Sequence, residues 1–348
     1  MSCLFSPGSA GGGRMEFMKS LQKIPVRILV TGSRGKSSIV RLLSAALSGA
    51  GLSVMGRITG VLPRELNGKE ECLILRSGPG SVEEMRWWLR TLPPGLDAVV
   101  MENSAVDPEL QPLAWNWLHP GCTVLTNVRP DHEEVWGRGE EMASLALCSA
   151  IGGGPVVLPS SVAEKPFVSE ILCGQGCNLN PCPDGATFRE GHLSIVKETC
   201  RLFGFEAEKC ADFAADLPPD IADFKVFREG EGCLASAFSA NDPESTESLF
   251  LSVGWNREET TVLYNSRKDR VGRLRSFSSW LSAFPWKRVV ITGNRPFPLP
   301  GGSEYVSFPS PESMKQFIRA EGKVFGCGNV AGAPLEYLLH SPEEEALV

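Results

Sequence analysis

The sequence lacks any long hydrophobic run. Hydrophobic residues make up 42% of its 348 residues, yet they occur in stretches too short to cross a bilayer. No signal peptide is recognisable either. These absences argue against a membrane-spanning protein, and we expect a soluble, globular one.

Positive charge is also scarce. The chain carries 34 Lys and Arg against 41 Asp and Glu, which gives a formal net charge of −7. A general nucleic-acid-binding surface depends on clustered Lys and Arg that neutralise phosphates, so we predict no nucleic-acid partner. An anionic ligand must instead be held by a local basic site.

Histidine is rare, with four residues, whereas cysteine is frequent, with eleven. The cysteines are scattered, and their one local cluster, Cys173, Cys177 and Cys182, has neither a nearby histidine nor a second Cys-x-x-Cys pair to complete a zinc site. We therefore expect buried, reduced thiols in a cytoplasmic protein.

The length is sufficient for two domains, each with its own core. The first residues are rich in Gly and Ser, and we assign 1–20 to a disordered extension. Apolar strand-like runs then alternate with helix-like segments, which is typical of a doubly wound, mostly parallel α/β sheet. We predict a central domain over 21–245 and a smaller C-terminal α/β domain over 246–348.

Hydrophobic periodicity and helix-start signals define the expected elements. In the central domain we predict strands at 26–31, 72–76, 97–102, 122–127 and 155–158, and helices at 36–50, 82–90, 108–117 and 140–150. In the smaller domain we predict strands at 249–253, 261–265, 289–292 and 324–326, and helices at 270–283 and 310–319. The stretch 178–242 is irregular, and the prolines that flank Cys182 are typical of a turn or linker.

A phosphate-binding loop follows the first strand. The sequence from Ile28 to Ser38 is an apolar strand, a Gly-rich turn, and then a lysine and two hydroxyls at a helix start. Glycines allow backbone amides to approach phosphate oxygens, and the helix N-terminus favours the same anion. Lys36 would contact the outer phosphates, and Ser37 or Ser38 would bind magnesium. The expected nucleotide-binding residues here are Gly32, Ser33, Arg34, Gly35, Lys36, Ser37 and Ser38.

Two further strand ends bring polar groups to the same predicted edge of the sheet, where open α/β folds bind ligands. Glu102 ends the strand at 97–102 and would bind magnesium. The strand at 122–127 brings Asn127, Arg129 and His132 to this edge. Arg129 would neutralise an acidic substrate or a developing phosphate charge, and His132 suits a second metal or a phosphate contact. Together with Lys36, these groups predict phosphoryl-transfer chemistry.

The smaller domain contributes two polar segments. Residues 264–270 follow a strand and are dense in groups that bind anions and amides. Residues 326–332 form a Gly-rich turn after another strand, which would either bind an anion or simply make a tight turn.

Read in order, these motifs resemble the Mur-ligase superfamily, and within it the poly-γ-glutamate synthase ligase subunits of the CapB/PgsB type. The resemblance is carried by Thr31-Gly-Ser-Arg-Gly-Lys-Ser-Ser38, Glu102 with 105–109, 126–132 with Gly137, 238–246, 265–270 and 326–332.

The resemblance implies a Mur-ligase-like fold and an ATP- and Mg²⁺-dependent amide ligase that works through an acyl phosphate. It implies Ser37, Glu102 and His132 as metal ligands, Asn127, Asn265 and Arg270 as further nucleotide-binding residues, and Arg129 and Arg267 as substrate-binding residues. The resemblance also implies five catalytic residues. Three are Lys36, Glu102 and His132, and the other two, Arg267 and Asp269, would come from a mobile smaller domain. Lys165 is one candidate for the carbamylated lysine of many Mur ligases.

The implied substrate is glutamate or a growing γ-glutamyl chain. The resemblance implies small membrane subunits as partners. A cytoplasmic protein would then work at the inner face of the membrane. Formation of a homo-oligomer stays an open alternative. Two other functions also stay open: a Mur-type ligase for another acidic acceptor, because the fold does not fix the acceptor, and a catalytically silent nucleotide-binding assembly subunit.

Overall fold

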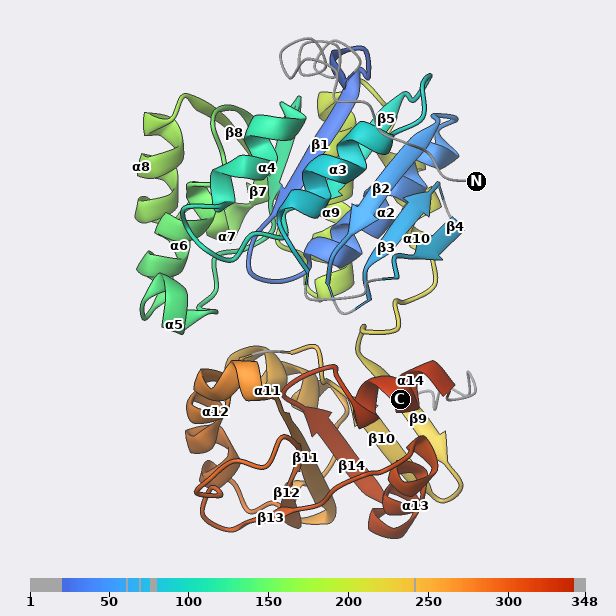
Figure 1. The fold of residues 1–348 in the computed structure, drawn as a ribbon, viewed down its shortest axis with the longest axis vertical. Coiled ribbons are helices and arrows are strands. Elements are labelled where there is room, and N and C mark those ends of the chain that lie inside the picture. The colour runs from blue at the N-terminus through green and yellow to red at the C-terminus, as the bar shows by residue number, and fades with distance from the viewer. Residues whose placement is uncertain (1–20, 61, 69, 76–79, 241, 341–348) are drawn as a thin grey trace, which may run out of the picture. The chain divides into compact units, whose positions relative to one another are not determined.

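The computed structural model describes residues 21–340 except 61, 69, 76–79 and 241, and it leaves the side chains of Asp269 and Val271 undescribed (Figure 1). The predicted extension at 1–20 therefore lies outside the described residues. The chain divides into two compact units, the first ending at Pro218 and the second beginning at Pro219.

The first unit is built on one mostly parallel sheet with the strand order β4-β3-β2-β5-β1-β6-β7-β8, in which the β2–β3 and β3–β4 pairs are antiparallel. Its strands are β1 (Val26–Thr31), β2 (Val54–Ile58), β3 (Arg64–Asn67), β4 (Glu70–Leu73), β5 (Ala98–Glu102), β6 (Cys122–Leu125), β7 (Gly154–Pro159) and β8 (Cys177–Cys182). Its helices are α2 (Lys36–Gly49), α3 (Glu83–Thr91), α4 (Gln111–Leu118), α5 (Glu133–Trp136), α6 (Glu140–Cys148), α7 (Ser160–Ala163), α8 (Pro166–Gly174), α9 (Phe188–Leu202) and α10 (Ala207–Ala215).

Helices cover both faces of this sheet (Figure 1). Alternate residues of a strand face opposite sides, and β1 shows this directly: Ile28 and Val30 pack with α2, α9 and α10, while Leu29 packs with α3 and α4. A strand buried on both faces is mostly apolar. This is why β1 (Val-Arg-Ile-Leu-Val-Thr) and β5 (Ala-Val-Val-Met-Glu) were predictable as mainly hydrophobic runs.

The second unit is built on a sheet with the strand order β13-β12-β11-β14-β10-β9, parallel except for the β9–β10 pair. Its strands are β9 (Lys225–Glu229), β10 (Gly232–Ser236), β11 (Thr260–Ser266), β12 (Arg288–Gly293), β13 (Ser303–Tyr305) and β14 (Lys323–Cys327). Its helices are α11 (Pro243–Ser252), α12 (Val271–Ala283), α13 (Pro311–Glu321) and α14 (Ala333–His340), with single 3₁₀ turns at Arg257–Glu259 and Lys268–Arg270. The predicted α/β fold class is confirmed.

The boundary between the two units lies at 218/219, earlier in the chain than the predicted boundary at 245/246. The reason is that β10 pairs in parallel with β14 and antiparallel with β9, so residues 225–236 belong to the second sheet. The stretch 178–242, predicted to be irregular, contains most of β8 and all of α9, α10, β9 and β10. Pro181 lies in β8, which is the outer strand of its sheet, where proline is tolerated.

The predicted strand at 249–253 is wrong, because residues 249–252 form the last turn of α11 and Val253 is its C-cap. The helix begins with strong local signals: the Asp242 side chain accepts a hydrogen bond from Ser245 N, and Pro243 occupies the first turn. A short apolar run does not by itself distinguish a strand from the buried side of a helix. Here the helix-start signals at Asp242 and Pro243, and not the apolar run, indicate the structure that forms.

Candidate functional site

The phosphate loop is where the sequence placed it, between β1 and α2. Gly35 is the N-cap of α2 and adopts a left-handed conformation with φ of 75°, and Gly32 has φ of 130°. The fourteen-residue helix α2 therefore begins directly at Lys36. The unpaired amides of its first turn and the positive end of its dipole would favour an anion at the loop.

The loop is tied to the segment after β6. Asn127 accepts hydrogen bonds at Oδ1 from Ser33 Oγ (2.6 Å) and from the amide of Arg34 (3.2 Å), and its Nδ2 donates to the Arg34 carbonyl (3.0 Å). Thr126 Oγ1 donates to the same carbonyl. Asn127 was predicted to bind the cofactor. These contacts support an indirect contribution, in which Asn127 shapes the loop that would bind it.

Gly32 is a position where any side chain would collide with its neighbours. A Cβ there would lie 2.1 Å from Thr126 Oγ1, whereas a Cβ at Gly51, which also has positive φ (93°), would meet open space. We expect Gly51→Ala to cost about 1 to 2 kcal/mol of unfolding free energy, from conformational strain alone. Gly32→Ala should cost about 1 to 3 kcal/mol more, because of the collision. Urea denaturation of both variants measures the difference, and equal losses would contradict the steric argument.

Ser37 and Glu102 lie in contact. Ser37 Oγ donates to Glu102 Oε2 at 3.1 Å, and the amide of Thr59 donates to the same oxygen at 2.8 Å. Glu102 is 3% exposed. Ser37 lies in the first turn of α2, which follows β1, and Glu102 is the last residue of β5. They come close because β1 and β5 are parallel neighbours and end at the same edge of the sheet. Two of the predicted metal ligands are thereby brought together beside the phosphate loop.

Lys36 lies at the first position of α2, and its Nζ donates to the carbonyl of Gly32 at 2.6 Å. The ammonium group is thus folded over the loop. Ser38 follows in the first turn of the helix.

His132 lies on the other side of the loop. Its Nε2 is 3.5 Å from Asp131 Oδ2, and Asp131 makes a 2.6 Å ion pair with Arg34 in the phosphate loop. The imidazole also packs on Trp136, with 5.1 Å between ring centroids. His132 has φ of 48°, so the backbone turns sharply there before α5. These contacts connect His132 to the loop through Asp131 and Arg34, and Arg129 precedes it in the same connection.

Lys165, the candidate for carbamylation, caps α8, and its Nζ pairs with Glu140 Oε2 at 2.9 Å. That contact gives no support to the assignment.

In the second unit, Asn265 is the penultimate residue of β11 and is 2% exposed. Its Nδ2 donates to the carbonyls of Asn329 (2.7 Å) and Ala331 (2.9 Å), and Asn329 Nδ2 donates back to the carbonyl of Asn265 (2.7 Å). This reciprocal pair holds the 326–332 turn against β11, which favours the tight-turn interpretation of that segment. Arg267, Asp269 and Arg270 come shortly after Asn265 in the chain, and their predicted roles stay predictions.

Sequence reasoning missed two parts of the site. The first is the segment after β2: Thr59 bonds Glu102, and a Cβ on Gly60 would lie 2.5 Å from Ser37 Oγ. The second is His192 on α9, whose Nε2 would lie 2.8 Å from a Cβ on Gly35. Neither β2 nor α9 was predicted. The available signals were a Gly that follows a short, mostly apolar run and a rare histidine near a helix start.

Burial lowers the pKa of His192 to about 4 from an ordinary value of 6.5. Between these two values the unfolded chain binds a proton that the folded chain does not, so stability falls as the pH drops from 6.5 toward 4. We expect His192→Gln, which cannot titrate, to flatten this dependence by an amount on the order of 1 to 3 kcal/mol. Urea denaturation across this pH range tests it, and identical slopes would contradict the lowered pKa.

The fold of this chain is similar to the folds of Mur ligases and folylpolyglutamate synthases of known structure. MurF from Acinetobacter baumannii has a TM-score of 0.66 and 12% identity, covering 94% of this chain and 78% of that one. E. coli FolC in complex with ADP has a TM-score of 0.65 and 15% identity, covering 93% and 90%. A Yersinia pestis folylpolyglutamate synthase/dihydrofolate synthase, complexed with AMPPNP and a Mn ion, gives a TM-score of 0.64 at 15% identity, covering 93% and 90%.

By sequence, the chain is similar to proteins named CapB. Residues 221–345 match the poly-gamma-glutamate synthase CapB C-terminal domain. The chain is 24% identical to PGA synthase CapB of Bacillus subtilis over 95% of this chain and 94% of that protein. It is also 24% identical to the capsule biosynthesis protein CapB of Bacillus anthracis, over 90% and 76%. The predicted resemblance is confirmed, and these relatives agree with the predicted enzyme class, an ATP-dependent ligase.

Within the described residues, no helix is both long and apolar enough to span a bilayer.

Proposed function

We propose that this chain is an ATP- and Mg²⁺-dependent ligase that forms γ-glutamyl amide bonds and so synthesises poly-γ-glutamate. The observation that carries the proposal is the contact of Ser37 with Glu102 beside the phosphate loop. The similarity to PGA synthase CapB along almost the whole chain supports the choice of substrate, glutamate or a γ-glutamyl chain.

The residues of the site fit a magnesium ion. A serine hydroxyl and a carboxylate are the hard oxygen donors that Mg²⁺ prefers, and this ion usually takes one or two carboxylates and keeps its remaining positions for water and phosphate. Among the described residues, no group of three or more His, Cys, Asp or Glu could hold a metal. Ser37 and Glu102 would therefore hold the ion together with the nucleotide. When bound, it neutralises charge on the phosphates.

The chain's own groups would act on ATP as follows. Loop amides from Gly32 to Ser37 and the N-terminus of α2 bind the phosphates, and Lys36 places a positive charge on them. Asn127 keeps the loop in shape through its three hydrogen bonds. His132, held between Asp131 and Trp136, is our proposed contributor to a second metal site.

The reaction has two steps. A carboxylate oxygen of the substrate attacks the γ-phosphorus, the bond to the ADP oxygen breaks, and an acyl phosphate forms. An amine nitrogen then attacks the acyl carbon, phosphate leaves, and the nitrogen loses a proton. Arg129 and Arg267 are our proposed carboxylate-binding residues, since guanidinium groups bind carboxylates in two-point contacts. Asp269 would be catalytic, and Asn265 and Arg270 would serve the nucleotide.

The experiment is phosphate release from ATP and Mg²⁺ with glutamate or oligo-γ-glutamate whose carboxylates carry ¹⁸O. An acyl phosphate transfers one ¹⁸O to the released phosphate, which mass spectrometry detects. Glutamate-dependent release with ¹⁸O transfer is the expected result. Release with ¹⁸O transfer from another acidic compound, and none from glutamate, would favour the second candidate, a Mur-type ligase for a different acceptor. ATP binding without any release would favour a silent assembly subunit.

The proposal includes where the protein works. A cytoplasmic ligase that associates at the inner face of the membrane with small membrane subunits would suit synthesis of an exported polymer, and self-association would be compatible with it. Fractionation of cells that produce the chain with and without candidate subunits tests this part. Recovery only in the cytosolic fraction in both cases would contradict it.

A further inference from the structure

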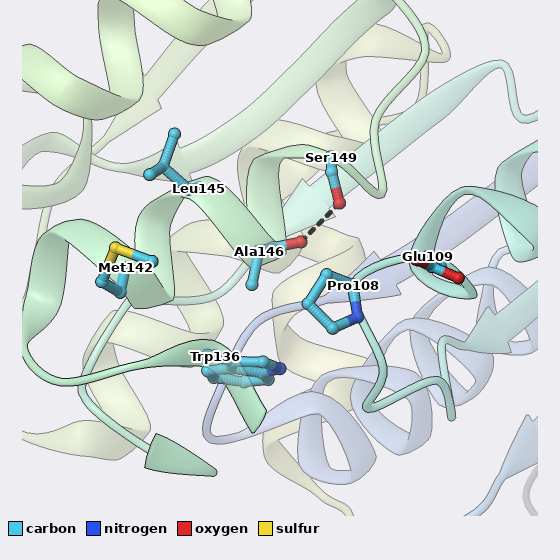
Figure 2. A pocket seen from close by; sticks show the side chains of 7 residues that line it. All are labelled: Pro108, Glu109, Trp136, Met142, Leu145, Ala146 and Ser149. Atoms are coloured by element: carbon cyan, nitrogen blue, oxygen red, sulfur yellow. Dashed lines mark hydrogen bonds between the residues drawn. The ribbon is translucent and has the colours of Figure 1, made fainter. Parts of the chain in front are cut away.

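The first unit carries an apolar groove outside the phosphate loop. It is lined by the loop after β5 and by α5 and α6, through Pro108, Glu109, Trp136, Met142, Leu145, Ala146 and Ser149 (Figure 2). Figure 2 shows Met142 and Leu145 on α6, Trp136 on α5, and Pro108 and Glu109 on the facing loop. The groove has a volume of about 310 Å³.

This groove exposes large apolar side chains. Leu145 is 46% exposed and Met142 39%. Exposed large apolar side chains gathered at one place indicate an interaction site rather than chance exposure. The groove is also open rather than enclosed. Sites for small molecules enclose most of their ligand, so an open apolar groove favours a protein segment.

The surroundings of the groove are acidic. Glu109 lines the groove itself, and the segments that contribute the lining residues also expose Asp107, Glu133, Glu134, Glu140 and Glu141, against an exposed base at Arg138; we call these carboxylates the acidic rim. Lys165 pairs with Glu140, which leaves the excess negative. Charge complementarity steers partners and excludes those of like charge. The rim therefore disfavours nucleic acids and anionic membranes.

A second copy of this chain is also a poor match. The chain has a net charge of −7, and a two-fold symmetric contact would place one acidic rim against the other. A helix with apolar side chains along one face and basic residues beside them would match both the apolar lining of the groove and the acidic residues around it.

We propose that this groove docks a basic amphipathic helix of a partner protein. Apolar side chains spaced at i, i+3 and i+4 enter between Trp136, Met142 and Leu145, and Lys or Arg residues lie beside the acidic rim. The docked helix would contact Trp136, which bonds the Val106 carbonyl through Nε1 at 2.6 Å and packs on His132. The site is distinct from the proposed nucleotide site, and docking does not depend on catalysis.

The test uses a fluorescent peptide of about fourteen residues, roughly four helical turns, made of Leu at i, i+3 and i+4 spacing with Lys elsewhere. Binding to the full chain is measured by fluorescence polarisation. Two control peptides carry Glu in place of Lys, or the same composition with the spacing scrambled. We expect binding of the first peptide alone, weakened by added salt because the charges are exposed.

The matched variants are Leu145→Arg in the groove and Leu251→Arg on α11, where Leu251 is 63% exposed outside the groove. We expect Leu145→Arg to weaken peptide binding by about tenfold or more and Leu251→Arg to leave it unchanged. Thermal unfolding confirms that both variants fold. Equal binding of the scrambled or acidic peptide, or no loss with Leu145→Arg, would overturn the proposal. Self-association that Leu145→Arg abolishes would also overturn it, in favour of a second copy.

Discussion

Lys36→Ala should lower the rate of glutamate-dependent ATP hydrolysis by about 10² to 10³-fold, the usual cost of losing one group that stabilises transition-state charge. The lysine starts α2 beside Gly32 and folds over the phosphate loop. No other described lysine lies in this loop, and its arginine, Arg34, is already paired with Asp131, so we expect no neighbour to replace the charge of Lys36 fully on the phosphates. Steady-state phosphate release measures the effect.

The fold should survive this change. Lys36 is only partly buried, and surface substitutions of this kind shift the unfolding free energy by about 0.5 kcal/mol or less. Lys23→Ala, at an exposed lysine before β1, is the matched control and should keep full activity. A Lys36→Ala enzyme that retained wild-type turnover would remove the phosphate-loop assignment.

Glu102→Gln should produce a loss of about 10²-fold or more, and the loss should depend on magnesium. Glutamine keeps the size of glutamate and an oxygen that can still accept from the Thr59 amide and Ser37 Oγ, which both bond Glu102 now. The substitution therefore removes a negative charge and leaves the hydrogen bonds. A neutral amide oxygen is a much weaker ligand for a hard cation. Titrating activity with Mg²⁺ should show a higher half-saturating concentration.

Glu109→Gln provides the comparison, because Glu109 is an exposed carboxylate further along the same β5 connection. It should leave both turnover and magnesium dependence unchanged. If Glu102→Gln lowered the rate equally at every magnesium concentration, the carboxylate would have a role other than metal binding.

Local motifs were the most predictable part of this protein. The phosphate loop was recognisable because a buried parallel strand, a glycine turn and a helix start follow one another within a few residues, and each has its own physical requirement. Glu102 and Asn127 were predicted to share an edge with the loop because parallel strands end on the same side of a sheet. The register of β1 with β5 and β6 confirms that common edge.

Features that depend on distant partners were harder to predict. β2 has the sequence Val-Met-Gly-Arg-Ile, whose arginine interrupts the apolar run; Arg57 is tolerated in the core because it pairs with Glu84 on α3. The contact of His192 with Gly35 joins residues far apart in the chain. The local sequence around α9 contains no signal that predicts the proximity of His192 to Gly35.

The hydrogen bonds between Asn127 and the phosphate loop have a thermodynamic consequence. A loop held in place before any ligand arrives has already lost its conformational freedom during folding. Nucleotide association then avoids much of that entropic penalty, which is the general advantage of preorganisation. Residues 32–35 are therefore ordered during folding and not during binding. The side-chain amide of Asn127, which follows β6, provides the hydrogen bonds that hold them.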